Sequence, residues 1–113
     1  MVYKRGDIVL IPIPFTDLAS NRKRPVLILS ASQYNENTKE MIVAAITSNF
    51  DKNVYAVKIK QNDLREGNLF YDSWVRADKL YTLPQAIVVI KFGSVKDSVL
   101  AVVTDKILDI FEH

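Results

Sequence analysis

Two polar side chains at the ends of apolar, strand-like runs are the best candidates for chemistry in this chain. Arg24 follows a basic stretch and precedes Pro25, and Thr47 ends the run from Ala44 to Ile46. Arginine is a permanently charged group with five donors, and the threonine hydroxyl can donate or accept. If the fold brings them together, the pair is suited to holding a phosphate and stabilising the charge that builds on it during reaction.

Each of these residues also has an ordinary structural interpretation. Arg24 could pair with an acid such as Asp17 or Asp78, and a threonine at a strand end often bonds its local backbone. If Arg24 acts in catalysis, its pKa above about 12 suits it better to charge stabilisation than to the work of a general base. No histidine lies near Thr47 in sequence to activate it as a nucleophile, because the single histidine is His113.

Basic and aromatic residues extend the candidate site in sequence. No acidic residue lies between Asp17 and Glu36, although such basic runs are often only solvated surface. A third cluster contains Ser73, Arg76 and Lys79; in a regular strand, Arg76 would point away from the other two. Phe15 and Tyr81 are candidates for stacking on unpaired bases, and either could equally be buried.

Composition excludes several classes of site. The chain has no cysteine, so it has no disulfide, thiolate metal site or cysteine nucleophile. Its acidic residues are scattered rather than spaced as metal ligands, and three glycines do not form a phosphate-binding loop. We therefore expect neither a metal nor a cofactor. The net charge of +2, from 15 basic and 13 acidic residues, does not identify a nucleic-acid partner by itself.

The length of 113 residues, 49% of them hydrophobic, predicts one domain over residues 1–113 with a single core. The first residues lack an apolar signal core, and no apolar run approaches the roughly 18 residues that a transmembrane helix needs. We therefore expect a soluble, cytoplasmic protein.

Short apolar runs predict a mainly β protein with one terminal helix. Arg24 should be extended because it precedes a proline, and residues 54–60 alternate as in a half-buried strand. Helical spacing predicts an amphipathic helix over residues 95–111, after a capping-box pattern at Ser94 and Asp97. This order suggests a small curled sheet or barrel closed by the helix. Strands are predicted at 7–15, 26–29, 41–46, 54–60, 74–83 and 86–92, and loops at 16–23 and 34–39.

The chain resembles the PemK/MazF family of toxin endoribonucleases from type II toxin–antitoxin modules. The resemblance covers nearly the whole chain, in the family's order, and rests on a combination of short motifs. It implies an SH3-like, CcdB-like β-barrel with a C-terminal α-helix, assembled as a homodimer that cleaves single-stranded RNA and is neutralised by a cognate antitoxin. The motifs are Gly6 to Val9, Pro14 to Asp17, Lys23 to Ser30, Ala44 to Ser48, Asp72 to Val75, Lys79 to Leu83, and Gly93 before the helix.

The resemblance also implies roles for individual residues. Arg24 and Thr47 take the catalytic positions, and the loop from Thr16 to Lys23 flanks the RNA groove. The expected reaction uses the RNA 2′-hydroxyl as nucleophile, leaves a 2′,3′-cyclic phosphate and a 5′-hydroxyl, and needs no metal or cofactor. The residues expected to contact RNA are Phe15, Thr16, Asp17, Arg22, Lys23, Ser48, Ser73 and Lys79.

Two departures and two other functions stay open on the sequence alone. Some family members carry glutamine and arginine where this chain has Lys79 and Tyr81, which leaves the sequence preference and the activity undetermined. One other function is a non-catalytic, CcdB-like toxin that poisons DNA gyrase. Another is a dimeric nucleic-acid-binding module without activity. The pairing of Arg24 with Thr47 favours the ribonuclease, since a gyrase poison would not require it.

Overall fold

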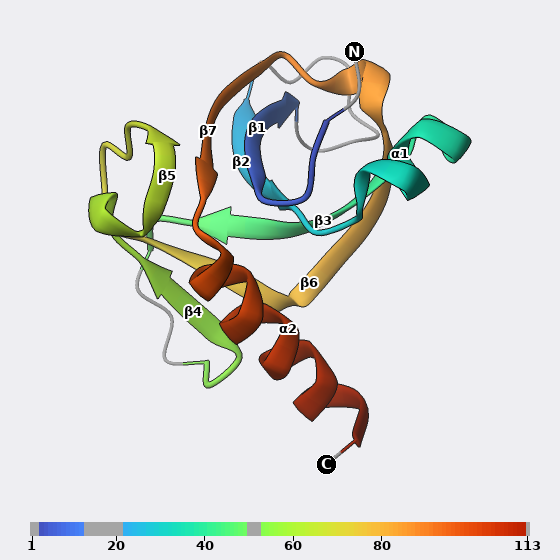
Figure 1. Ribbon diagram of the computed structural model, residues 1–113. Helices are drawn as coiled ribbons and strands as arrows, with labels where there is room; N and C mark the ends of the chain where they lie inside the picture. Colours follow the sequence, from blue (N-terminus) through green and yellow to red (C-terminus); the bar gives the residue numbers. More distant parts are fainter. Residues whose placement is uncertain (1–2, 13–21, 50–52, 113) are drawn as a thin grey trace.

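Strands form the largest part of the described chain. The computed structural model describes residues 3–12, 22–49 and 53–112 (Figure 1). Phe15, Thr16, Asp17 and His113, together with most of the predicted loop, therefore lie outside the described residues. The strands are β1 (Asp7–Pro12), β2 (Lys23–Ile28), β3 (Glu40–Thr47), β4 (Ala56–Ile59), β5 (Leu64–Gly67), β6 (Ser73–Pro84) and β7 (Ile90–Val95). The helices are α1 (Ser32–Thr38) and α2 (Asp97–Glu112), with 3-10 turns η1 (Gln61–Asp63) and η2 (Gln85–Ile87).

The strands described form one antiparallel sheet in the order β4-β6-β3-β2-β1-β7-β5. The sheet is strongly curled, and α2 packs beside β6 and β4 before it extends away toward the C-terminus (Figure 1). Curling lets a small sheet bury apolar side chains on both of its faces. The predicted fold class, mainly β with a C-terminal helix, is confirmed.

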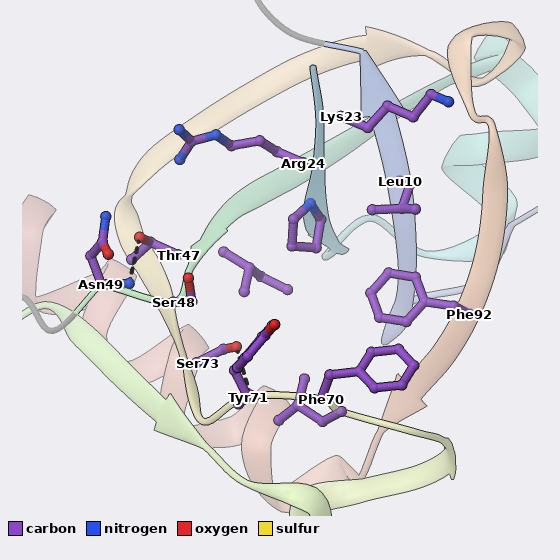
Figure 2. Close-up of a pocket in the computed structure, with 13 residues that line it drawn as sticks. Leu10, Lys23, Arg24, Thr47, Ser48, Asn49, Phe70, Tyr71, Ser73 and Phe92 are labelled. Atoms are coloured by element: carbon purple, nitrogen blue, oxygen red, sulfur yellow. Dashed lines mark hydrogen bonds between the residues drawn. The ribbon is translucent and has the colours of Figure 1, made fainter. Parts of the chain in front are cut away.

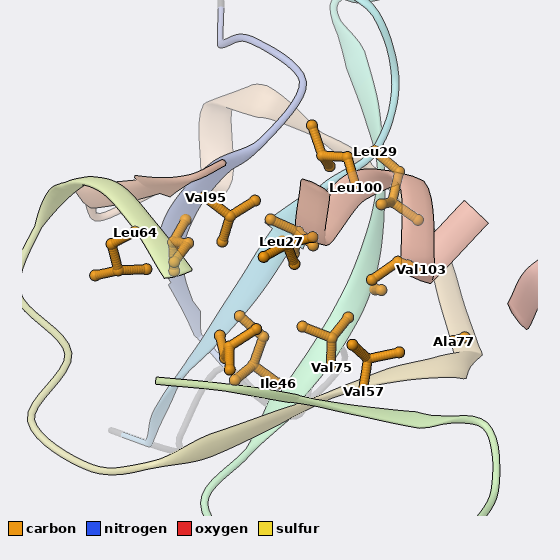
Figure 3. Packing of buried hydrophobic residues seen from close by; sticks show 14 residues of the cluster. Leu27, Leu29, Ile46, Val57, Leu64, Val75, Ala77, Val95, Leu100 and Val103 are labelled. Carbon is orange, nitrogen blue, oxygen red and sulfur yellow. The ribbon is translucent and has the colours of Figure 1, made fainter. Parts of the chain in front are cut away.

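Each face of the curled sheet packs its own hydrophobic cluster. The larger cluster lies between the sheet and α2, where Leu27 and Val75 contact Val103 and its neighbours (Figure 3). The smaller cluster, on the other face, includes Val26 and Met41. Adjacent residues of β2 thus serve opposite clusters, as the period of two along a strand requires. Both faces being buried explains why β2 and β3 read as continuous apolar runs rather than as alternating ones.

The strands predicted over residues 26–29 and 54–60 are confirmed with different bounds: β2 begins earlier, at Lys23, which the prediction placed in the loop, and β4 covers only Ala56–Ile59. Arg24 and Pro25 lie within β2, so the extended conformation expected before the proline is present. In β4 the predicted alternation holds, because Val57 and Ile59 are buried while Lys58 is exposed.

The loop predicted over residues 34–39 is wrong, because residues 32–38 form the helix α1. This helix has no apolar face, and its buried residue is the polar Asn35. Distant partners hold it: Asn35 Nδ2 donates to the Tyr3 carbonyl at 2.7 Å, and Gln85 Nε2 donates to the Asn35 carbonyl at 2.7 Å. Contacts between residues so far apart in the chain leave no local signal in the sequence.

Two predictions near the C-terminus need correction. Residues 86–92 are not one strand, because η2 occupies the first part, anchored by Gln85, and β7 begins only at Ile90. The final helix begins at Asp97 rather than Val95, and Ser94 is in β7 and does not cap it. The reason is that the Val95 N–H donates to the Gly6 carbonyl at 2.9 Å, which keeps Val95 in the sheet.

Strand β5 was not predicted, and two glycines bring it against β7. Gly67 has a φ of +90°, and a Cβ at this position would lie 2.2 Å from the carbonyl oxygen of Phe92. It pairs directly with Gly93, where a Cβ would lie 2.9 Å from the Glu66 carbonyl oxygen. The two backbones therefore approach more closely than any side chain allows. This contact fixes the start of the connection from β5 to β6, which borders the site.

No helix in residues 3–12, 22–49 and 53–112 combines the length and the apolar character that crossing a membrane would require.

Candidate functional site

The pairing of β2 with β3 brings Arg24 and Thr47 close together. Val26 pairs with Ala45, and Leu27 pairs with Ala44. Continuing this antiparallel register two residues beyond Val26 and Ala45 reaches Arg24 on one strand and Thr47 on the other. Directly opposed residues point to the same face of a sheet. Two side chains that are 23 positions apart in the sequence therefore meet at one end of the strand pair.

Arg24 and Thr47 both line an open hollow of about 390 Å³. Lys23, Ser48 and Ser73 line the same hollow, so five of the ten residues predicted for the site gather there. Figure 2 shows the Arg24 guanidinium on the same side of this hollow as the Thr47 hydroxyl. The guanidinium and the alcohol thus converge in an accessible space rather than in the core.

A second hollow of about 380 Å³ adjoins the first, and it is lined by Arg24 and Thr47 as well as by Arg76, Lys79 and Tyr81. Pro25 and Ile46 also line both hollows. In β1, Leu10 lines only the first hollow and its neighbour Ile11 only the second. Because neighbouring residues of a strand point to opposite faces, the two hollows lie on opposite faces of the sheet.

Arg76 and Lys79 line the same hollow, which contradicts the prediction that they point to opposite sides. The pairing of β6 with β3 explains the difference: Leu80 pairs with Ala44, but Arg76 already pairs with Ala45. Residues 77–79 therefore bulge out of the ladder and reverse the alternation. Ser73 lines the other hollow, so the expectation that the three residues do not share one surface holds.

The Arg24 side chain is exposed and makes no hydrogen bond or ion pair with any residue of 3–12, 22–49 and 53–112. Asp78, one of its two expected partners, binds Arg76 instead, with both nitrogen-to-oxygen distances at 2.9 Å. These hydrogen bonds from Arg76 hold the pKa of Asp78 below its usual range. The other expected partner, Asp17, lies outside the described residues. Among the described residues, therefore, nothing neutralises the charge of the Arg24 guanidinium.

Two hydroxyl groups of the site differ in what they offer a ligand. Thr47 Oγ1 accepts the backbone N–H of Asn49 at 3.2 Å, so its acceptor side is engaged while its proton can still be donated. Ser73 is buried, and its Oγ donates to the Tyr71 carbonyl at 3.0 Å. Thr47 is therefore placed to meet a ligand, whereas Ser73 holds the backbone of the opposite wall.

The remaining predicted residues are distributed as follows. Arg22 is exposed just before β2 and lines neither hollow. Tyr81, a candidate for stacking, lines the second hollow and is partly exposed. Phe15, Thr16 and Asp17 lie outside the described residues.

The sequence reasoning missed Phe70 and Tyr71, which line the first hollow from the β5–β6 connection. A signal for them exists: the apolar run Leu69-Phe70-Tyr71 directly follows the turn residues Gly67-Asn68, where a polar loop is ordinarily found.

The chemistry that the site offers is cationic and hydroxylic. The described lining of both hollows contains Lys23, Arg24, Arg76 and Lys79 but no carboxylate. Across residues 3–12, 22–49 and 53–112, no three His, Cys, Asp or Glu side chains gather as metal ligands would. A guanidinium without a partner among the described residues, beside a donating hydroxyl, is suited to a phosphate group, which offers acceptor oxygens and negative charge.

Comparison with known protein families agrees with this chemistry. Residues 4–111 match the sequence model of a family described as PemK-like, MazF-like toxin of type II toxin-antitoxin system. Among curated protein sequences, the chain has no significant match.

Solved structures share the fold over almost the whole chain. MazF from Deinococcus radiodurans superposes with a TM-score of 0.78 at 23% identity, covering 100% of this chain and 99% of that one. A MazE–MazF crystal form from the same organism gives 0.81 at 25% identity, with 98% and 97% covered. A mycobacterial endoribonuclease, solved with its cognate antitoxin, gives 0.78 at 16% identity, with 96% and 94% covered.

Proposed function

Because the chain belongs to the PemK-like, MazF-like toxins of type II toxin–antitoxin systems, we propose that it is a metal-independent endoribonuclease that cleaves single-stranded messenger RNA in the cytoplasm. The observation that carries the proposal is the pairing of an unpartnered guanidinium with a hydroxyl in one open hollow. Arg24 makes no ion pair within the described residues, and Thr47 lies opposite it across β2 and β3. The family supplies the substrate class, and the residues supply a phosphate site.

The reaction begins with the RNA itself. The 2′-oxygen forms a bond to the adjacent phosphorus, and the bond from phosphorus to the 5′-oxygen of the next nucleotide breaks. The 2′-hydroxyl gives up its proton, the departing 5′-oxygen gains one, and the products are a 2′,3′-cyclic phosphate and a 5′-hydroxyl. This step consumes no external nucleophile or oxidant, so the protein's contribution is to position the reacting groups and stabilise the charge between them.

Arg24 acts on the charge of the transition state. The equatorial oxygens of the five-coordinate phosphorus carry more negative charge than the starting diester, and a guanidinium beside them lowers the free energy of that state selectively. Because Arg24 is not neutralised by any described residue, its charge is fully available to the phosphate.

Thr47 acts as an oriented donor. Its Oγ1 accepts the Asn49 N–H at 3.2 Å, which fixes the direction in which the hydroxyl proton can point. A donor held in this way aligns a phosphate oxygen or the ribose hydroxyl for in-line attack. Lys23 and Ser48 line the same hollow and would contact the RNA backbone beside the reacting phosphate. Lys79, in the second hollow, would meet a further phosphate as a point charge.

The proposal includes two protein partners. We infer a homodimer and a cognate antitoxin, as the family resemblance implies. The antitoxin complexes of the Deinococcus and mycobacterial proteins support this part, since both superpose on nearly the whole chain. An antitoxin segment that covers the cationic hollow would inhibit by competing with RNA.

The test starts with purified protein and a long unstructured RNA in EDTA. We expect cleavage, with 5′-hydroxyl ends and 2′,3′-cyclic phosphates on the fragments. Sequencing those ends gives the cleavage site, and an oligonucleotide is then made with one deoxyribose 5′ to the scissile phosphate. This oligonucleotide should resist cleavage because it lacks the nucleophile. Cutting at the same bond would overturn the internal attack.

The other functions give different outcomes in the same assay. If RNA stays intact while purified gyrase is inhibited, the protein is a gyrase poison. If RNA is bound but not cut, with and without added divalent cations, the chain is a binding module. Cleavage that EDTA abolishes and Mg²⁺ restores would overturn metal independence alone.

A further inference from the structure

Two exposed aromatic rings lie across the first hollow from Arg24, and the mechanism above makes no use of them. Phe70 is 84% exposed and Tyr71 is 73% exposed, yet both line the hollow. Figure 2 shows their rings on the wall opposite Lys23 and Arg24. Rings exposed to this extent add little to the stability of the fold. A ligand that covers them would bury their apolar surface, which is favourable for binding.

The short loop that carries these rings is held at both ends. At its start, Gln61 Nε2 donates to the Gly67 carbonyl at 3.0 Å, and Gln61 Oε1 accepts the Leu69 N–H at 2.7 Å. At its end, the buried Ser73 donates to the Tyr71 carbonyl at 3.0 Å. The rings are therefore presented by a fixed backbone, which reduces the entropy lost when a ligand binds.

The two walls match the two halves of a nucleotide. Lys23 and Arg24 on one wall suit the anionic phosphate, and the flat faces of Phe70 and Tyr71 on the other suit a base. Proteins that bind single-stranded nucleic acid combine the same two elements, a basic groove and aromatic side chains on which bases stack. An acidic peptide would use only the cationic wall, so the pairing of walls favours RNA.

We propose that Phe70 and Tyr71, here named the aromatic ledge, stack an unpaired RNA base next to the phosphate held by Arg24 and Thr47. Stacking fixes the register of the strand, so that one phosphate comes to rest at the reactive pair. The ledge thus acts on substrate binding more than on the bond-making step. This inference rests on the proposed function in one respect, namely that the ligand is RNA.

The test measures binding without cleavage. Short 2′-O-methyl oligonucleotides that tile a long messenger RNA lack the nucleophile, and fluorescence anisotropy identifies the tightest of them. Replacing both ledge residues by alanine should weaken binding by roughly 5- to 100-fold, the range for loss of stacking on one base. The exposed Phe111 gives a matched control: it is 77% exposed on α2 but lines neither hollow. Phe111→Ala should bind like the wild type.

An abasic scan identifies the stacked base. In the wild type, one abasic position should weaken binding about as much as the ledge substitution does. In the protein with Phe70→Ala and Tyr71→Ala, the same abasic position should lower the affinity little further, because the rings that stack on the base are already absent. With natural RNA, the ledge variant should show a raised KM and a smaller change in kcat.

Several results would overturn the ledge, and they differ from failure of the proposed function. The stacking role would be excluded if the double variant kept its affinity, or if the abasic position lowered the affinity equally in both proteins. Neither result would contradict RNA cleavage by the protein. A variant that loses its dimer or its antitoxin but keeps RNA affinity would make the ledge a protein-contact surface. Conversely, coupling between the aromatic ledge and one base, in a protein that cuts no RNA, would support base stacking and contradict the proposed ribonuclease activity.

Discussion

Lys91 and Arg24 are both basic residues on strands of the same sheet, but their surroundings differ. Lys91 Nζ lies 2.8 Å from Glu66 Oε1 and 3.3 Å from Asp7 Oδ1, and it joins β7 to β5 and β1. Arg24, at the opposite end of β2 from the turn into α1, has no ion pair within the described residues. Lys91 stabilises the fold through its ion pairs. No described residue neutralises Arg24, so its charge can bind a ligand. An exposed cation without a described partner is thus the better candidate for binding an anion.

The surroundings of Lys91 also explain how the charges there are fixed. Asp7 is only 5% exposed, and its Oδ2 also accepts the Lys4 N–H at 2.9 Å. The hydrogen bond with Lys91 lowers the pKa of Glu66, and the same bond raises the pKa of Lys91. Each group therefore stays ionised over a wider range of pH than it would alone. Substitutions at Arg24, at Lys91 and at their neighbours test this difference between the two cations.

Arg24→Met should abolish most of the activity and leave the fold intact. Loss of one donor to a developing anion typically lowers kcat by about 10²- to 10³-fold. The exposed side chain without described partners predicts an unchanged melting temperature. RNA cleavage and thermal unfolding measure the two quantities.

Arg65 supplies the matched control, because its exposed guanidinium is paired with Asp97 at 2.9 Å and lines neither hollow. Arg65→Met should keep its activity. Equal losses in both variants would mean that the availability of Arg24 is irrelevant.

Thr47→Val should lower kcat by about 10- to 100-fold, the effect expected for losing a hydrogen bond to a charged phosphate. The variant also removes the acceptor of the Asn49 N–H, so a small fall in stability is expected. Thr47→Ser keeps the hydroxyl and should retain most of the rate. If valine is as active as serine, the hydroxyl has no part in the reaction.

Lys91→Met should lower stability and leave activity intact, the opposite of the result expected for Arg24→Met. The substitution leaves the buried Asp7 carboxylate without its cation, and we expect a loss of about 1–3 kcal/mol of unfolding free energy. Urea unfolding measures this value. Specific activity of the folded fraction should be unchanged at a temperature well below the transition, and a large kcat loss without destabilisation would break the contrast between the two cations.

Glu66→Gln should have the smallest effect, and the effect should depend on pH. The pKa of Glu66 is lowered in the folded protein, so its contribution is present above the unfolded value of 4.5 and is lost as the pH falls through the folded value. The difference in stability between wild type and Glu66→Gln should therefore shrink below about pH 4.5. A gap that widens in acid would contradict the ion pair with Lys91.

The parts of the fold that sequence predicted are those that depend on local pattern. Residues 54–60 alternate because β4 is covered on one side only, and Pro25 forces an extended Arg24 in any context. Strand β5 had no such pattern: Leu64 is its one buried residue, and Lys91 and the close contact of Gly67 with β7 hold the rest. The sequence of these four residues does not show the hydrogen bonds that β7 supplies to β5, so the strand could not be predicted from local pattern.

The site was predictable in its residues but not in its geometry. Arg24 and Thr47 could be selected by residue type and by their places at the ends of apolar runs. Their meeting depends on the register of β2 with β3, which are connected through α1 rather than by a tight turn of defined length. The bulge at residues 77–79, which turns Arg76 and Lys79 toward the same hollow, is likewise a property of the assembled sheet.

The four residues shared by the two hollows limit the shape of a ligand that can fill both hollows. Arg24, Pro25, Ile46 and Thr47 form a saddle with a depression on each flank. A molecule that fills both depressions must bend sharply over the saddle. A duplex is too stiff and too broad to do so, whereas a lone strand turns freely about its backbone bonds. If the ligand is RNA, as proposed, this curvature would favour a single strand over paired RNA.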